Sequence, residues 1–225
     1  MWRYFRGTIG RVLSQTGLAM DARHRGLNDI FSHEHPHSLH QPIQPLSDAP
    51  AIFSESCKVA STSSLIGKVE LGENVIVSSG CTLNAIELPI RLDEGAVVSE
   101  GAVLISRKGD EKITGSVNIG KNVFVGEKSI VNGCLIDEDA FIGRGVFIGN
   151  GVMIEKGAKV LDFTLVPNGA ILKADTVYGG AHAEEIRKIS EEDKKEIAKR
   201  LNSARSMHKA IDDARFFIQM PANLA

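Results

Sequence analysis

Residues 136–160 read IDEDAFIGRGVFIGNGVMIEKGAKV. Within this stretch an isoleucine or valine returns at every sixth position, and a small or β-branched residue stands four places after each full step. A period of six fits neither the 3.6-residue period of an α-helix nor a long two-residue alternation. It suits short flat strands joined by tight corners, and it therefore predicts a left-handed parallel β-helix of hexapeptide repeats. The aliphatic positions are Ile136, Ile142, Ile148, Ile154 and Val160.

The same period extends back to about residue 51. We expect the aliphatic row to face the core together with a second row of small or β-branched residues. Glycine often follows the aliphatic residue directly, where a tight turn benefits from the missing Cβ (Gly67, Gly72, Gly120, Gly126, Gly143, Gly149). The aliphatic row begins with Ile66, Leu71, Val77, Leu83, Leu92, Val98, Leu104, Ile119, Val125 and Val131, and the second row includes Val75, Cys81, Ala102, Val123, Ser129, Ala140, Val146, Val152 and Ala158.

Two segments depart from the hexapeptide pattern. Between Leu104 and Ile119 the charged stretch 107–112 interrupts the period, which predicts a loop that leaves the stack. After Gly179-Gly180 the pattern becomes helical: Ser190 and Asp193 form a capping box, and an apolar stripe (Ile197, Leu201, Ala204, Ile211) follows. We expect this helix to pack along the flank of the β-helix. The tail with Phe216, Phe217, Ile218 and Met220 is expected to cap the prism or pack on a neighbouring subunit.

The amino-terminal segment 1–26 is basic and amphipathic. Five arginines stand against the single acid Asp21, with Phe5, Ile9, Val12 and Leu13 at helical spacing between them. Such an Arg-rich, acid-poor pattern is typical of a mitochondrial targeting segment, and it also suits docking on a membrane face or a hydrophobic subunit. An ordinary basic surface helix is the alternative. The candidate partner-binding residues are Arg3, Arg6, Arg11, Arg23 and Arg25.

A proline-rich linker follows at residues 27–50. Its four prolines disfavour both helix and central strand, so we expect an extended strap lying across a partner. Four histidines in the linker are candidate metal ligands, although a proline-broken segment lacks the supporting shell that fixes ligand geometry (His33, His35, His37, His40). The expected organisation is therefore 1–26 amphipathic segment, 27–50 linker, 51–181 β-helix, 182–215 helix and 216–225 tail.

Composition excludes several classes of protein. The 225 residues carry 26 basic and 28 acidic side chains, so no global basic field favours nucleic acid. Three widely spaced cysteines, Cys57, Cys81 and Cys134, fit neither a disulfide framework nor a Cys-x-x-Cys metal motif. No apolar run approaches the roughly 20 residues that cross a bilayer.

Several separate runs resemble the γ-class carbonic anhydrases, and specifically the γ-carbonic-anhydrase-like subunits of mitochondrial respiratory complex I. These runs occur in the family's order and span nearly the whole chain. They are residues 16–21 (Thr-Gly-Leu-Ala-Met-Asp), 80–83 (Gly-Cys-Thr-Leu), 136–143 (Ile-Asp-Glu-Asp-Ala-Phe-Ile-Gly) and 178–183 (Tyr-Gly-Gly-Ala-His-Ala).

The resemblance also locates the positions that matter for catalysis. Catalytic members of the family hold zinc on three histidines, two from one subunit and one from its neighbour. Residues 126–134 resemble the run Gly-His-Ser-x-x-x-His-Gly-Cys, so that Glu127 and Asn132 replace two histidines, while Ile105 replaces the third. No histidine lies between His40 and His182. The Arg-Gly-Asp run of subunit contacts becomes Asn84-Ala85-Ile86, and a glutamine near the family's site becomes Ser99.

The resemblance implies a structural subunit rather than an enzyme. We expect a catalytically inactive chain in a heterotrimer with other γ-carbonic-anhydrase-like chains, on the matrix side of the inner mitochondrial membrane and attached to the membrane arm of complex I. We expect this chain to bind no metal or cofactor, while sibling subunits could still hold zinc between them. Contact with the inner-membrane surface is a further expectation for the amino-terminal segment.

Two enzymatic alternatives remain open. A hexapeptide acyltransferase using acyl-coenzyme A would share the repeats, but such enzymes generally need a histidine general base near the flank of the prism. A degenerate carbonic anhydrase would need other ligands, for which Glu127, Asn132 and Cys134 are the candidates.

Overall fold

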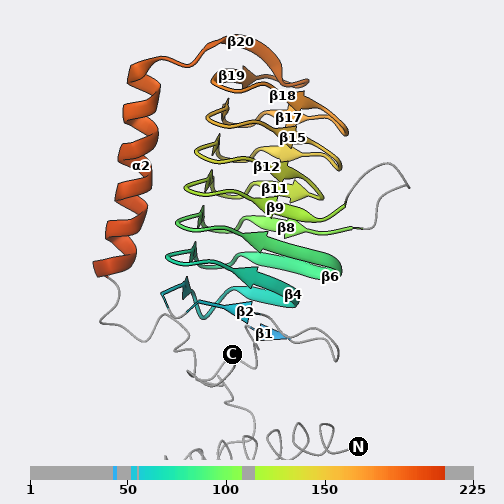
Figure 1. The fold of residues 1–225 in the computed structure, drawn as a ribbon, viewed down its shortest axis with the longest axis vertical. Coiled ribbons are helices and arrows are strands. Elements are labelled where there is room, and N and C mark those ends of the chain that lie inside the picture. The colour runs from blue at the N-terminus through green and yellow to red at the C-terminus, as the bar shows by residue number, and fades with distance from the viewer. Residues whose placement is uncertain (1–42, 45–51, 55, 108–114, 211–225) are drawn as a thin grey trace, which may run out of the picture. The chain divides into compact units, whose positions relative to one another are not determined.

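Short parallel strands dominate the computed structural model, which describes residues 43–44, 52–54, 56–107 and 115–210 (Figure 1). The predicted amino-terminal helix with its five arginines, the four linker histidines, loop residues 108–114 and the tail 216–225 lie outside the described residues. The strands are β1 (Ile43–Gln44), β2 (Ile52–Phe53), β3 (Lys58–Val59), β4 (Ser64–Leu71), β5 (Ile76–Val77), β6 (Thr82–Leu92), β7 (Val97–Val98), β8 (Val103–Ile105), β9 (Val117–Ile119), β10 (Phe124–Val125), β11 (Ile130–Asn132), β12 (Leu135–Ile136), β13 (Phe141–Ile142), β14 (Phe147–Ile148), β15 (Met153–Ile154), β16 (Lys159–Val160), β17 (Leu165–Val166), β18 (Ile171–Leu172), β19 (Thr176–Gly179) and β20 (Glu184–Lys188), and the helix is α2 (Glu191–Ala210).

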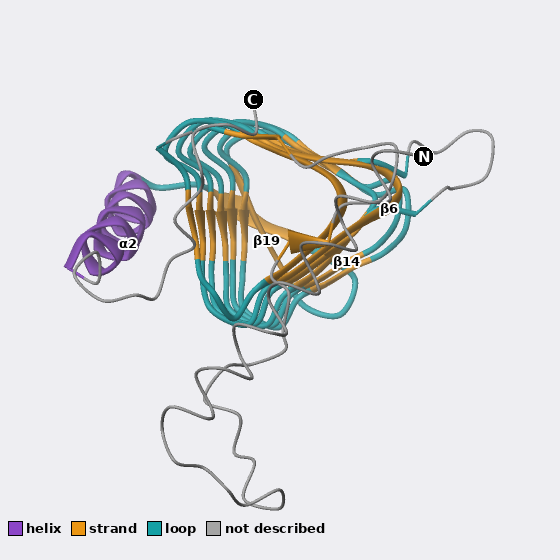
Figure 2. Ribbon diagram, turned by 90° about the horizontal axis from the view of Figure 1, so that it is seen from below, coloured by secondary structure: helices purple, strands orange, loops and turns teal. Residues whose placement is uncertain are grey.

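The strands wind into a left-handed parallel β-helix, as the six-residue period predicts. A regular coil takes 18 residues, so that the backbone N–H of Arg144 bonds the side chain of Asp162 one coil further on. Each coil gives one strand to each of three flat faces, which surround the core as a triangle when viewed along the stack (Figure 2). Face 1 consists of β3, β5, β7, β10, β13, β16 and β19; face 2 of the first parts of β4 and β6 with β8, β11, β14 and β17; and face 3 of β2, the second parts of β4 and β6, β9, β12, β15 and β18.

The core is filled by the predicted aliphatic row, with one correction. Leu65, not Ile66, occupies the inward position of its coil: Leu65 is 1% exposed, whereas Ile66 is only partly buried. A strict period of six also runs through residue 65, because Leu71 and Val77 follow at six-residue steps. The row continues beyond Val160 through further buried residues, namely Val166, Leu172 and Tyr178.

The corners use left-handed backbone conformations at a fixed position. The third residue after each inward aliphatic has positive φ in thirteen corners, which glycine, asparagine and aspartate tolerate best. Two bulky residues break that rule, Lys128 at φ 56° and Phe163 at φ 58°. The thirteen are Asn74, Gly80, Gly95, Gly101, Asn122, Lys128, Asp139, Gly145, Gly151, Gly157, Phe163, Gly169 and Asp175.

The glycines that directly follow an aliphatic residue have a different role from the predicted one. A Cβ on Gly126 would lie 2.4 Å from the carbonyl oxygen of Gly143 in the next coil, and one on Gly120 would lie 2.8 Å from the backbone nitrogen of Glu138. These glycines are therefore needed for the close approach of stacked coils rather than for a turn conformation. Gly67 is the exception, since its φ is 82°.

The structure differs from two predicted boundaries, the start of the β-helix at residue 51 and the start of the helix at residue 182. The predicted linker, residues 27–50, includes Ile43 and Gln44. In the structure they form a strand that pairs in parallel with Leu65 and Ile66, so part of the proline-rich segment belongs to the β-helix. Glu184–Lys188, placed in the carboxyl-terminal helix, forms β20 antiparallel to β19. The helix begins at Glu191, directly after the predicted capping box.

Helix α2 covers face 1 and runs antiparallel to the direction of the stack (Figure 1). Its residues Ile197, Leu201 and Ala204 pack against a row of outward apolar side chains on successive strands. The prediction that this helix packs along the flank of the β-helix is therefore confirmed. The row consists of Ile76, Val97, Phe124 and Phe141, of which the two phenylalanine rings stack at 5.1 Å.

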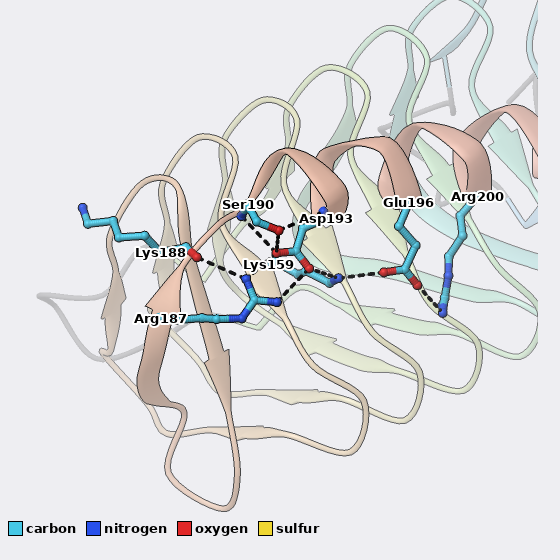
Figure 3. Close-up of polar contacts among 7 residues, drawn as sticks. All are labelled: Lys159, Arg187, Lys188, Ser190, Asp193, Glu196 and Arg200. Carbon is cyan, nitrogen blue, oxygen red and sulfur yellow. Dashed lines mark hydrogen bonds and ion pairs between the residues drawn. The ribbon is translucent and has the colours of Figure 1, made fainter.

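An ion-pair cluster centred on the buried pair Lys159–Asp193 fixes the first turn of α2 (Figure 3). Ser190 and Asp193 exchange the two hydrogen bonds of a capping box, at 3.0 and 3.2 Å. Asp193 also accepts from Lys159 of β16 at 2.9 Å and from Arg187 of β20, and Glu196 accepts from Lys159 at 3.0 Å. Hydrogen bonds from Arg187 and then Lys159 hold the pKa of Asp193 well below its usual range. The cluster therefore joins the helix to two strands.

Candidate functional site

Ile105 and Asn132 lie side by side at the corner between faces 2 and 3. They are the last residues of β8 and β11 and are register partners in this parallel pair. Asn84 of β6 is the register partner of Ile105 one coil earlier, so that the three side chains form a column. All three are partly buried. The fold thus brings together two of the three positions that the resemblance marks as degenerate metal ligands.

Glu127 lies at the opposite edge of face 2. It follows β10, is exposed, and precedes β11, whose far end carries Asn132. Together with Arg144 and Arg200, it lines a surface cavity of about 390 Å³ between α2 and the corner that joins faces 1 and 2. Within one chain, therefore, Glu127 cannot complete a site with Ile105 and Asn132.

The side chains at the shared corner are unsuited to hold a metal. Ile105 has no donor atom, and Asn132 offers only a neutral amide oxygen, with its amide nitrogen donating a hydrogen bond of 3.0 Å to the carbonyl oxygen of Ile148. Among the described residues no group of three His, Cys, Asp or Glu side chains gathers at ligand distance. Zinc prefers three or four histidine, cysteine or carboxylate ligands. The residues that the resemblance assigns to the zinc position therefore do not fit that metal.

The corner itself is one residue shorter than the same corner in the next coil. Val131 and Ile136 are five positions apart, where Ile148 and Ile154 in the next coil are six apart. Gly133 closes this short corner, and a Cβ on it would lie 2.8 Å from the Cα of Gly115 and closer still to the Oδ1 of Asn150. The backbone is therefore packed too tightly here for any larger residue.

The shortening also interrupts a ladder of asparagines. In the next corner the backbone N–H of Asn150 donates to the Oδ1 of Asn168 at 2.9 Å. One coil earlier, the backbone N–H of Gly133 does not donate to the Oδ1 of Asn150. It donates instead to the carbonyl oxygen of Ile105 at 3.0 Å. As a result the Oδ1 of Asn150 is buried without a hydrogen-bond partner among the described residues.

Cys134, the remaining candidate ligand, points into the core. It is 2% exposed, and burial raises the pKa of its thiol to about 12. Metal binding requires the thiolate, which burial disfavours strongly at neutral pH. Cys134 therefore acts as a small core residue in the second inward row.

Sequence reasoning missed an apolar row on the outside of face 2. The residues directly before the inward aliphatics are Val103, Ile130, Phe147 and Leu165, and each is the register partner of the next. Ile130, Phe147 and Leu165 are exposed. The signal was available in the sequence as the position preceding each core aliphatic. Because this row lies between Glu127 and the Ile105–Asn132 corner, it belongs to the same surface.

Comparisons with known proteins point to one family. No protein-family model matches the chain. The chain is 29% identical over 189 residues to γ carbonic anhydrase 2, mitochondrial, of Arabidopsis thaliana, an alignment that covers 83% of this chain and 67% of that protein. It is 25% identical over 197 residues to γ carbonic anhydrase 1, mitochondrial, of the same plant, covering 83% and 71%.

Solved structures share the fold. A hexapeptide transferase family protein from Anaplasma phagocytophilum superposes with a TM-score of 0.68 at 23% identity, covering 75% of this chain and 96% of that one. A protein from Bacillus cereus, assigned as an acetyltransferase, superposes with a TM-score of 0.69 at 20% identity, covering 78% and 100%. At these identities the likeness extends to the β-helix and not to its chemistry.

Proposed function

Because the chain is a γ-carbonic-anhydrase-like protein, related to mitochondrial members over most of its length, we propose that it is a structural subunit without catalytic activity. One observation carries this proposal. At the corner where the family holds zinc, Ile105 supplies no ligand. The amide nitrogen of Asn132 donates a hydrogen bond to the carbonyl oxygen of Ile148 in the next coil. Without zinc the chain cannot lower the pKa of a bound water, which is how such a metal generates its nucleophile.

The contacts of this subunit with sibling chains run through face 2. Its apolar row, Ile130, Phe147 and Leu165, is exposed in the single chain and lies on a flat sheet surface. The two edges of this face carry different residues, Glu127 on one and Ile105 with Asn132 on the other. A head-to-tail arrangement in which unlike edges meet generates a closed ring, which supports a trimer with other γ-carbonic-anhydrase-like chains.

Such a trimer keeps zinc away from this chain. The interface formed by its Ile105–Asn132 corner lacks two ligands, and the interface formed by Glu127 lacks a histidine. Sibling chains that retain their histidines could still hold zinc at the interface between them. In this proposal the chain contributes a surface for assembly of the trimer and does not catalyse a reaction.

The relatives support a mitochondrial location, and we assign the subunit to the matrix side of the inner membrane, on the membrane arm of complex I. No helix among the described residues is long and apolar enough to span a membrane. We assign attachment to surfaces of the β-helix and to the amino-terminal arginines Arg3, Arg6, Arg11, Arg23 and Arg25. These arginines and the apolar residues between them suit a membrane surface or a hydrophobic subunit.

The principal alternative is a hexapeptide acyltransferase, a class that shares the β-helix fold. An acyltransferase of this kind needs a general base near the flank of the prism, usually histidine. The coils between His40 and His182 contain none. A degenerate carbonic anhydrase with Glu127, Asn132 and Cys134 as ligands is the other, but Cys134 is buried in the core and separated from Glu127 by the width of face 2.

Affinity purification of the native protein from mitochondria in mild detergent tests the proposal. Mass spectrometry of the co-purified chains and metal analysis of the isolated trimer are the measurements. We expect sibling β-helix chains and membrane-arm subunits of complex I, with no zinc coordinated by this chain. A free homotrimer that holds stoichiometric zinc and hydrates carbon dioxide would refute the structural role, and transfer of an acyl group from acyl-coenzyme A would favour the alternative.

A further inference from the structure

Face 3 carries an exposed apolar row confined to its carboxyl-terminal half. Leu135, Met153 and Ile171 follow one another in register and are 37%, 43% and 63% exposed. The preceding coils are polar at the same outward position, which holds Glu70, Arg91 and Asn118, and Arg91 and Glu70 form an ion pair there at 2.6 Å. Ile52, 55% exposed, stands apart from the row at the amino-terminal end of the face. Large side chains that are exposed together in one half of a face, and replaced by an ion pair in the other half, indicate a docking surface of limited length.

The molecule itself shows what fits such a row. On face 1 the outward apolar side chains of successive strands are covered by α2, which places Ile197 and Leu201 on Phe124 and Phe141. Stacked strands lie about 4.8 Å apart on every face of the prism. The row on face 3 therefore presents the same spacing and the same outward position to an occupant as the row under α2. The packing of α2 on face 1 shows that an amphipathic helix fits a row with this geometry.

Charge distinguishes the occupant of face 3 from α2. On face 1 the second outward position is small in most strands, including Ser99 and Gly126, and Leu161 is the exception. On face 3 the corresponding position directly follows the inward aliphatic, and along the apolar row it holds Asp137, Glu155 and Lys173. Asp137 is exposed and forms no ion pair among the described residues, whereas Glu155 accepts a hydrogen bond of 2.9 Å from the backbone N–H of Ala174. The Leu135–Met153 part of the row is thus bordered on one side by two carboxylates, which favour positive charge, while Lys173 lies beside Ile171.

We propose that the carboxyl-terminal half of face 3 docks an amphipathic α-helix of a partner protein. The apolar stripe of that helix packs on Leu135, Met153 and Ile171, and lysine or arginine side chains along one border of the stripe face Asp137 and Glu155. This surface is separate from face 2. The inference therefore does not rest on the proposed contact with sibling chains, and either can fail without the other.

Binding of a designed helical peptide to the full-length protein tests the proposal. The probe is a fluorescently labelled peptide of alanine, leucine and lysine, with leucine at every third or fourth position and lysine on both borders of that stripe. One control peptide has the same composition with the leucines scrambled, and another carries glutamate in place of lysine. Fluorescence anisotropy gives the dissociation constants.

Two variants provide a matched pair. Ile171→Glu introduces a charge into the row on face 3, whereas Ile186→Glu introduces the same charge at an isoleucine of β20 that is 56% exposed and lies outside face 3. Both positions are exposed, so both variants should fold, which circular dichroism checks. We expect Ile171→Glu to weaken binding of the amphipathic lysine peptide by at least about tenfold and Ile186→Glu to leave it unchanged.

A charge reversal and a membrane probe complete the test. Asp137→Lys should weaken binding of the lysine peptide and strengthen binding of the glutamate peptide. Equal binding of the amphipathic and scrambled peptides to the unaltered protein would overturn the proposal, as would full binding by Ile171→Glu. Binding to cardiolipin-containing vesicles that Ile171→Glu abolishes, without peptide binding, would assign the row to a lipid surface instead.

Discussion

Individual residues of this β-helix are constrained more by neighbouring coils than by their own strands. Gly126 and Gly169 show the contrast. Gly126 has an ordinary backbone conformation, yet a Cβ on it would lie 2.4 Å from the backbone of Gly143, whereas Gly169 has φ +69° with nothing within 4 Å. The first glycine is required by its surroundings and the second by its own conformation.

Substitution of the two glycines by alanine should therefore have unequal costs. Gly169→Ala is expected to lower the free energy of unfolding by about 1 kcal/mol, the cost of a left-handed conformation with a side chain. Gly126→Ala must displace a backbone segment of the next coil and should lower it by about 3 kcal/mol. Urea unfolding followed by circular dichroism measures both values. Equal losses would show that the coils can separate to accommodate a methyl group.

Residues at the degenerate zinc position are likewise set by packing. The amide of Asn132 bonds the carbonyl of Ile148, and Gly133 is enclosed by Gly115 and Asn150. The corner is therefore a well-packed structural element in its own right.

At the scale of elements, the docking of α2 depends on one carboxylate. Asp193 caps the helix through Ser190 and also receives Lys159 from β16 and Arg187 from β20. The side chains of Lys159 and Asp193 are only 9% and 8% exposed. Removal of one partner of a buried pair leaves the other charge uncompensated, which is costlier than removal of both.

Asp193→Asn should consequently loosen α2 from face 1. We expect the amide protons of residues 191–204 to exchange faster and the free energy of unfolding to fall by about 3 kcal/mol. The double variant Lys159→Met/Asp193→Asn should recover part of this loss, since no buried charge is left unpaired. Glu192→Gln in the same turn is the control and should have little effect, because Glu192 is exposed. If the single and double variants lose equal stability, the pair does not hold the helix.

Acid should release the helix in a defined pH range. The pKa of Asp193 is depressed in the folded protein by Arg187 and Lys159, and that of Glu196 by Lys159. Depressed carboxyl pKa values contribute stability that is fully present above the unfolded pKa of about 4 and is lost as pH falls towards the folded value. Protection of the α2 amides should therefore be constant from neutral pH to about pH 5 and decline below about pH 4. An unchanged acid profile in Asp193→Asn would assign the decline to other groups.

At the scale of the whole molecule, the three faces of the prism differ in what covers them. Face 1 lies under α2, face 2 carries the row proposed to contact sibling chains, and face 3 carries a shorter apolar row beside carboxylates. Among the residues that the structure describes, a helix covers face 1 alone, and the rows on the other two faces leave large apolar side chains exposed. This asymmetry is the structural basis for regarding the protein as part of an assembly.

Phe147→Glu tests the role of face 2 in that assembly. Phe147 is exposed at the centre of the row, so the variant should fold with an unchanged circular dichroism spectrum. Co-expressed with its sibling chains, however, it should fail to form the trimer, because a charge would be buried in an apolar interface. Native mass spectrometry of the assembled complexes measures the effect, with Ile186→Glu as the control. Normal assembly of Phe147→Glu would exclude face 2 as the contact.

Much of the fold could be predicted because the hexapeptide period is local. Leu71, Val77 and Leu83 stand at strict six-residue steps, and their burial follows from that spacing. The error at Ile66 arose where two aliphatic residues adjoin, so that composition alone could not choose the register. Strands β1 and β20 could not be predicted, because a two-residue pairing or a short antiparallel return depends on a sheet edge formed by distant residues.

The sequence by itself determined the β-helix, the capping box of the last helix and the absence of histidine from the coils. These properties depend on residues a few positions apart or on composition. Only the tertiary structure decided that Ile105 and Asn132 meet at one corner while Glu127 lies across face 2, and that face 3 divides into a polar and an apolar half. These contacts join residues that lie one or more coils apart in the sequence. Because the irregular coils are not 18 residues long, the sequence spacing of contacting residues varies, and the contacts can be identified only from the folded chain.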